Sequence, residues 1–130
     1  MFGWDEAEQS HQEVYRDNDP DERHQGKFSH ELLAGGAAFE GFKLYEDKQR
    51  KEGKTVNHAF AKEALMGLVG GEVDRLVETK GLDEADAYRT RHRAEKGASQ
   101  MYDEHYGGQD NYDPNSYDAP QQIQNYGGRY

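Results

Sequence analysis

The sequence predicts an all-α fold: an antiparallel helical hairpin with glycine-mediated close packing, a third helix, and a disordered C-terminal tail. Two long stretches, 29–51 and 57–80, are rich in apolar residues, and each begins at a helix-capping residue and ends beside a glycine. Several glycines lie inside both stretches, where they favour close contact between helices. From residue 107 onward the composition changes to Gly, Gln, Asn, Asp and Tyr.

The composition limits the size of the core and the class of partner. In 130 residues the hydrophobic fraction is 33% and the mean hydropathy is -1.24, so we expect one compact core with polar ends. The formal net charge is -10, which opposes binding to nucleic acid and to anionic membrane surfaces. We therefore expect neither nucleic acid nor a membrane as a partner.

Residues 1–27 are predicted to form an acidic N-terminal arm. The stretch DNDPDE is typical of a mobile segment, and one short helix is expected around residues 6–16. Phe2 and Trp4 are large apolar residues in this arm. Two roles are open for them: they pin the arm to the core, which we favour, or they bind a partner.

Residues 28–106 are predicted to form the helical core domain. Ser29 is a good N-cap for a helix that runs to about Lys51 and closes at Gly53. A second helix runs to Lys80, with Thr55 or Asn57 as its N-cap and Gly81 at its end. A third, weakly amphipathic helix covers the core built by the first two. Its predicted inward stripe comprises Ala85, Tyr88, His92, Ser99, Tyr102 and Tyr106.

The glycines inside the long helices are interpreted as holes for side chains of the neighbouring helix. If the hairpin turns at Gly53, residues whose numbers sum to about 106 face each other. The facing pairs are then Gly35 with Gly71, Gly36 with Gly70, Phe39 with Gly67, and Gly41 with Leu65. Each interior glycine costs about 1 kcal/mol relative to alanine, so close helix packing or a partner chain is needed to offset it. The alternative is that the glycines unwind a helix at a ligand site.

Both long helices are apolar on two sides, which predicts more neighbours than one weakly amphipathic third helix supplies. We therefore expect a homodimer in which two hairpins pair across a two-fold axis into a bundle of four central helices. The residues assigned to helix packing and self-association are Gly35, Gly36, Phe39, Phe42, Phe60, Gly67, Gly70 and Gly71.

Residues 107–130 are predicted to form a disordered tail rich in Tyr, Gly, Gln and Asn. Its composition buries too little apolar surface to offset the entropy of ordering. The spaced tyrosines make this tail a candidate site for a protein partner.

The motifs of common enzymes are missing from the sequence. There is no HExxH, no phosphate-binding glycine loop and no GxSxG, and His92 and His105 are too far apart along one helix to share a metal ion. Glu63 and Glu72 fall near apolar surface, as the acids of two-metal bundles do, but the Glu-x-x-His pattern is absent. We expect solvated or paired acids, and no catalytic residue, cofactor or metal.

The expected location is the cytoplasm. The first residues, MFGWDEAEQS, lack the basic and apolar regions of a secretion signal, and the absence of cysteine fits a reducing compartment. The longest apolar runs are far shorter than the roughly 20 residues that a membrane-spanning helix needs.

Four stretches of the sequence carry a family resemblance. They are MFGWDE, SHELLAGGAAFEGFKLYEDKQRKEGKTVNHAFAKEAL, GEVDRLVETKG and YDEHYG. Together they resemble the CipC-like (concanamycin-induced protein C) antibiotic response proteins of fungi, over most of residues 1–107. The resemblance implies a small, soluble fungal protein associated with stress or toxin response, and it carries over no catalytic residue or cofactor.

We therefore expect a non-enzymatic stress-response protein with a self-associating helical core that presents the acidic arm and the tyrosine-rich tail. The alternative function is binding of a hydrophobic small molecule or lipid between the glycine-lined helices. An enzyme is a more distant possibility.

Overall fold

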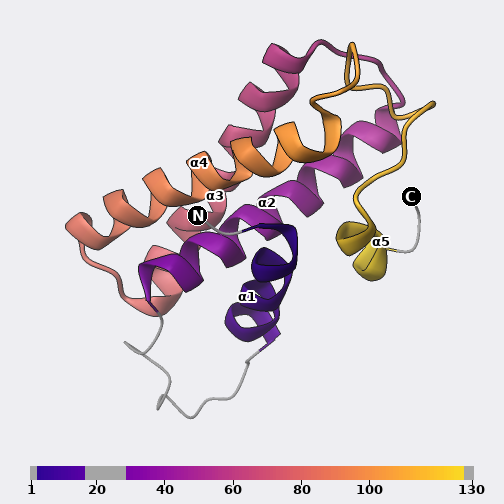
Figure 1. Cartoon of the computed structure of the whole chain (residues 1–130). Coiled ribbons are helices and arrows are strands. Elements are labelled where there is room, and N and C mark those ends of the chain that lie inside the picture. The colour runs from indigo at the N-terminus through magenta and orange to yellow at the C-terminus, as the bar shows by residue number, and fades with distance from the viewer. Residues whose placement is uncertain (1–2, 17–28, 128–130) are drawn as a thin grey trace.

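The computed structural model of the chain describes residues 3–16 and 29–127, and the predicted all-helical fold is confirmed there (Figure 1). The helices are α1 (Trp4–Arg16), α2 (His30–Glu52), α3 (His58–Lys80), α4 (Glu84–Tyr106) and α5 (Gln121–Gly127). The described residues form no β-strand, although one isolated antiparallel bridge joins Val56 to Tyr112. None of the described helices is long and apolar enough to cross a membrane.

The ends of the long helices lie close to where the sequence predicts them. The side chains of Ser29, Asn57 and Asp83 each accept a hydrogen bond from a backbone N–H three residues later, at 2.7–3.0 Å. Of the two N-caps proposed for the second helix, Asn57 is therefore the correct one. Gly53 and Gly81 end α2 and α3 with φ angles of 70° and 71°, a left-handed conformation that favours glycine.

Helix α2 lies at the centre of the molecule and packs against α1, α3 and α4, while α3 and α4 also pack against each other (Figure 1). Both apolar sides of α2 are thus covered by helices of the same chain. This arrangement fills much of the surface for which the sequence predicted a second copy. The structure contains one chain, so the predicted dimer stays a prediction.

Helix α1 belongs to the packed core. Trp4 is buried, its ring centroid lies 4.7 Å from that of Phe42, and its Nε1–H donates to the Met101 carbonyl oxygen at 3.1 Å. The prediction that Trp4 pins this segment to the core is confirmed, and the helix predicted around residues 6–16 begins at Trp4. Phe2 and residues 17–28 of the predicted arm lie outside the described residues.

The predicted pairing of glycines between the two long helices is wrong. Helices α2 and α3 approach each other closely at Gly41, where an added Cβ would lie 2.6 Å from Val69 Cγ2. Gly41 therefore faces a residue four positions beyond Leu65, its predicted partner. The reason is the length of the turn: α2 ends at Glu52 and α3 begins at His58, so the connection is centred near residue 55 and not at Gly53.

The glycine pair in α2 makes room for α1 instead of α3. An added Cβ would lie 3.0 Å from the Ser10 hydroxyl oxygen at Gly35 and 3.3 Å from Val14 Cβ at Gly36. Gly70 faces α4, where its added Cβ would lie 2.5 Å from Arg91 Nη1. These glycines thus act as holes for neighbouring helices, but the helices differ from those that the sequence arithmetic assigned.

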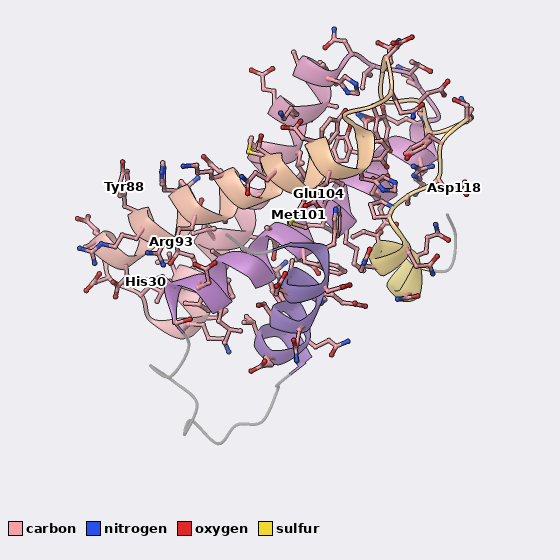
Figure 2. The ribbon with its side chains drawn as sticks, in the orientation of Figure 1. His30, Tyr88, Arg93, Met101, Glu104 and Asp118 are labelled. Carbon is pink, nitrogen blue, oxygen red and sulfur yellow. The ribbon has the colours of Figure 1, made fainter. Side chains whose placement is uncertain are left out.

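The inward stripe predicted for the third helix is wrong in its first half. Ala85, Tyr88 and His92 are exposed, and Figure 2 shows Tyr88 projecting away from α4. The buried side chains of α4 begin at Thr90 and continue through Ala94 and Ala98 to the predicted tyrosines. Small residues dominate this face where α4 approaches its neighbours. The predicted stripe placed the large ring of Tyr88 inward, and in the N-terminal half of α4 this selected the exposed side of the helix.

Residues 107–127 differ from the disordered tail that the composition predicts. They are ordered against the helices, with Tyr112, Ala119 and Ile123 buried, and in Figure 1 the segment runs back along the bundle to place α5 beside α2. Few apolar side chains are needed because many hydrogen bonds from core side chains hold its backbone. Residues 128–130 of the predicted tail lie outside the described residues.

Candidate functional site

The most deeply buried charge in the described part of the chain is the carboxylate of Glu46, on α2. Its side chain is inaccessible to solvent and accepts three hydrogen bonds. They come from Arg50 Nε at 2.7 Å, the Tyr106 hydroxyl at 2.5 Å and the Tyr112 hydroxyl at 2.8 Å. A buried carboxylate is tolerated only when it is paired and hydrogen-bonded in this way. We call Glu46, Arg50, Tyr106 and Tyr112 the Glu46 hub.

Arg50 joins the Glu46 hub to the C-terminal segment. Its Nη1 donates to the Pro114 carbonyl oxygen at 3.1 Å, and its Nη2 donates to the Tyr117 carbonyl oxygen at 2.8 Å and to the Tyr106 hydroxyl at 3.0 Å. The planar guanidinium can hold several acceptors at once, which a lysine cannot do with the same geometry. One side chain thereby fixes a turn of polypeptide more than 60 residues away in the sequence.

Two histidines hold other parts of the same segment. His58 Nε2 donates to the Gln109 carbonyl oxygen at 2.6 Å, and His105 Nε2 donates to the Asp118 carbonyl oxygen at 2.8 Å. The other ring nitrogen of His58, Nδ1, lies 2.7 Å from the Tyr102 hydroxyl. These contacts place His58 and His105 in structural roles.

The tyrosines of the Glu46 hub are held in their protonated form. Burial, and then the charge of Glu46, raises the pKa of Tyr106 and Tyr112 well above the ordinary value. Both hydroxyls therefore donate hydrogen bonds near neutral pH and do not serve as bases. The arrangement stabilises the fold, and it does not resemble a site for proton transfer.

The free energy of unfolding should fall steeply above about pH 10. Burial is the largest cause that raises the pKa of four core tyrosines, Tyr45, Tyr102, Tyr106 and Tyr112. The unfolded chain loses these protons near pH 10 whereas the folded chain keeps them. Each tyrosine thus contributes stability that is complete below about pH 10 and is lost at about 1.4 kcal/mol per pH unit above it.

Urea denaturation between about pH 9 and 11 measures this slope. The variant Tyr112→Phe provides the control, because removing one linked proton should reduce the total fall over this interval by about 1.4 kcal/mol. A free energy of unfolding that stays constant over this interval would contradict the prediction.

A second polar cluster connects α1 to α2 and α3. The Tyr15 hydroxyl donates to Glu72 Oε1 at 2.8 Å, Arg75 Nη1 lies 3.4 Å from Glu72 Oε2, and His11 Nε2 lies 2.7 Å from Glu40 Oε1. Burial, followed by the charge of Glu72, raises the pKa of Tyr15. The contact of His11 with Glu40 thus connects α1 to α2, and the contact of Tyr15 with Glu72 connects α1 to α3.

The acids and histidines considered as possible metal ligands do not converge. Glu72 is buried against Tyr15, whereas Glu63 is exposed on α3. His30 pairs with Asp86 at 2.7 Å, and His92 stacks on Tyr88. Among residues 3–16 and 29–127, no group of three or more His, Cys, Asp or Glu side chains could hold a metal ion.

The residues predicted to mediate self-association divide into two sets. Five of them are buried inside the chain: Gly35, Gly36, Phe39, Phe42 and Gly70. The other three lie on the outer face of α3: Phe60, Gly67 and Gly71. Phe60 is 52% exposed, and an added Cβ at Gly67 or Gly71 would meet no atom of residues 3–16 or 29–127 within 4 Å. The outer face of α3 is therefore the part of the predicted surface that stays accessible in this chain.

An open groove of about 380 Å³ separates this face from the C-terminal half of α2. It is lined by Tyr45, Lys48, Gln49 and Glu52 of α2 and by Phe60, Ala64, Gly67 and Leu68 of α3. Tyr45 is 1% exposed, and its hydroxyl has no hydrogen-bond partner among the described residues. A buried hydroxyl without a partner is costly, so it marks this groove as a candidate binding surface.

The Glu46 hub is hard to predict from the sequence. The spacing of Glu46 and Arg50 permits an ion pair one helical turn apart, and this is the only local signal. The other partners come from α4 and the C-terminal segment, 60 and 66 residues away from Glu46. The unpartnered Tyr45 hydroxyl likewise depends on packing that no local pattern reveals.

A family model described as "Virulence factor CipC-like" matches residues 10–105, which is most of the chain. The match spans the second half of α1, all of α2 and α3, and α4 except for its last residue, and it ends before the C-terminal segment. Searches of the curated proteins and of the solved structures gave no match. The resemblance to the CipC-like proteins is confirmed at the level of the family, and the chain belongs to the CipC-like virulence factor family.

Proposed function

We propose that this protein is a non-enzymatic stress or antibiotic-response protein that acts as a self-associating helical interaction module. The observation that carries the proposal is the outer face of α3, where Phe60 is half exposed and two glycines face open space. The family description and the resemblance to antibiotic response proteins support the biological role. We place the protein in the cytoplasm of a fungal cell, in line with the same resemblance.

The glycines in α3 destabilise the helix unless something approaches it closely. Glycine inside a helix costs about 1 kcal/mol relative to alanine. At Gly70 the close approach of Arg91 gives a reason for this cost within the chain, but at Gly67 and Gly71 no neighbouring atom of the described residues does so. A second molecule that approaches α3 closely would make use of both positions, because the missing side chains let two helices come nearer to each other.

The buried acids support a structural role over an enzymatic one. Glu46 and Glu72 already accept hydrogen bonds from tyrosine hydroxyls and lie beside arginines. An acid–base catalyst needs a titrating group within reach of a substrate. Neither carboxylate has this access, since both are buried among their partners.

A second candidate function is binding of a hydrophobic small molecule or lipid, and Tyr45 is the observation that favours it. The groove beside Tyr45 has apolar walls from Phe60, Ala64 and Leu68, with Lys48 and Glu52 at its rim. Burial raises the pKa of Tyr45, so its hydroxyl is a hydrogen-bond donor near neutral pH. A ligand with an apolar body and one acceptor oxygen would suit this lining.

Native mass spectrometry of the full chain distinguishes the two candidates. We expect an even-numbered oligomer for the wild type and monomers for Gly67→Leu, because leucine fills the space through which a second copy approaches α3. The matched control is Ala85→Leu, which adds leucine to an exposed position of α4 and should leave the oligomer intact.

A wild-type monomer at micromolar concentration would contradict self-association. If that monomer, purified from its own source, retained an apolar molecule that Tyr45→Phe released, the second candidate function would take its place. Circular dichroism of each variant checks that the helices are preserved.

A further inference from the structure

We infer that two copies of the chain pack antiparallel through the outer face of α3, with Phe60 of each copy seated on Gly71 of the partner subunit. This inference rests on the proposed self-association and specifies its geometry. It follows from the order of large and small residues along one exposed stripe of α3. We call Phe60, Ala64, Gly67 and Gly71 the α3 stripe.

The α3 stripe lies on one side of the helix. Its members follow each other at intervals of four, three and four residues, which keeps them on a single face of an α-helix. Phe60, Gly67 and Gly71 are exposed, and Ala64 is half-buried at the wall of the groove. The stripe therefore presents one large ring at one end and progressively less side chain toward the other.

The spacing reads the same in both directions, so the stripe is complementary to its own reverse. In an antiparallel pair centred between Ala64 and Gly67, residue 60 of one copy faces residue 71 of the other, and residue 64 faces residue 67. The large ring of Phe60 then meets a position without a side chain, and two small residues meet at the two-fold axis. This is how ridges of one helix enter the grooves of another, and a two-fold interface requires such self-complementarity.

Two further observations favour a second copy as the occupant of this face. The α3 stripe itself carries no charge, whereas the chain as a whole has a formal net charge of -10, so its four residues add no charge repulsion to a contact between copies. The stripe also borders the groove lined by Tyr45, whose buried hydroxyl lacks a partner among the described residues. A chain laid along α3 covers this groove.

Exchange of the facing residues tests this geometry. The single variants Phe60→Gly and Gly71→Phe should each weaken the dimer about tenfold or more, because one leaves two holes opposite each other and the other sets two rings against each other. The double variant Phe60→Gly/Gly71→Phe restores one large and one empty position in each facing pair. Its dissociation constant should return to within about threefold of the wild type.

The control places the ring at the wrong register. In Phe60→Gly/Gly67→Phe the ring faces Ala64 of the partner subunit, and the dimer should stay weak. All variants are measured by sedimentation equilibrium over a range of protein concentrations, with circular dichroism to check that each monomer is folded. The wild-type dimer should also tighten as salt is added, because salt screens the repulsion between two acidic chains.

The outcomes separate this inference from the proposed function. A wild-type monomer overturns both. A dimer that none of the α3 variants weakens leaves self-association standing and overturns the use of this face. If the single variants weaken the dimer and Phe60→Gly/Gly71→Phe does not restore it, the antiparallel register is overturned. If Phe60→Gly/Gly71→Phe restores the dimer and the control Phe60→Gly/Gly67→Phe does not, the register is supported.

Discussion

Replacing Arg50 by methionine should lower the free energy of unfolding by about 3–5 kcal/mol at neutral pH. Methionine replaces the aliphatic part of the arginine side chain but carries no charge. The Glu46 carboxylate is therefore left buried without its positive partner. Removing one member of a buried ion pair costs this much because the remaining charge stays out of water. The variant also loses the two hydrogen bonds from Arg50 to backbone carbonyls of the C-terminal segment.

Urea denaturation followed by circular dichroism measures this loss, and hydrogen exchange locates it. The Tyr112 amide, which donates to the Val56 carbonyl oxygen at 2.9 Å, should exchange faster in Arg50→Met because the C-terminal segment is released. The control is Arg93→Met: Arg93 lies 3.6 Å from Glu31, both side chains are about half exposed, and the loss should stay below about 1 kcal/mol. Equal losses in the two variants would contradict the special role of the Glu46 hub.

The Glu46 hub explains why composition misjudged the C-terminal segment. The sequence after Gly107 offers few apolar residues, and a composition argument counts only what such residues bury. The order of residues 107–127 depends on donors supplied by Arg50 and His58, which lie in α2 and α3. A segment's own sequence does not reveal hydrogen-bonding partners that are distant in the chain, so a local argument predicts disorder.

Helix boundaries were predictable because their signals are local. Ser29 and Asn57 satisfy backbone N–H groups three residues away, and Gly53 adopts a conformation that suits glycine. The register between helices was not predictable, because it depends on the length of the turn. Residues 53–57 hold no helical signal that fixes their path, and a shift of the turn by two residues moves every facing pair by four.

The predicted self-association surface includes both exposed and buried residues. The sequence placed Phe60, Gly67 and Gly71 in its self-association set because a large ring and interior glycines are visible there, and the structure leaves these three positions exposed. It could not separate them from Gly35 and Gly36, which serve α1. That distinction needed the position of α1, a helix that the sequence treated as part of a mobile arm. The packed chain therefore narrows the predicted self-association surface to one face of α3.

Replacing Gly41 by alanine should destabilise the protein by about 2 kcal/mol, whereas Gly67→Ala should stabilise it by about 1 kcal/mol. At Gly41 the new Cβ would lie 2.6 Å from Val69 Cγ2, 2.8 Å from its Cα and 2.9 Å from its backbone nitrogen. Because two of these atoms belong to the backbone, α2 and α3 must separate, at a cost near the upper end of overpacking, about 3 kcal/mol. The gain in helix propensity offsets about 1 kcal/mol of it.

The Gly67 variant makes the same chemical change in a helix of the same length, at a position where the new Cβ would meet nothing within 4 Å. Because the change in helix propensity is the same in both variants, the opposite signs of their stability changes would come from packing at Gly41. Urea denaturation at the lowest workable protein concentration makes the comparison, since a second copy at the α3 stripe would otherwise contribute at Gly67. If both variants gained stability, α2 and α3 would not meet at Gly41 and Val69, and the pairing centred near residue 55 would be wrong.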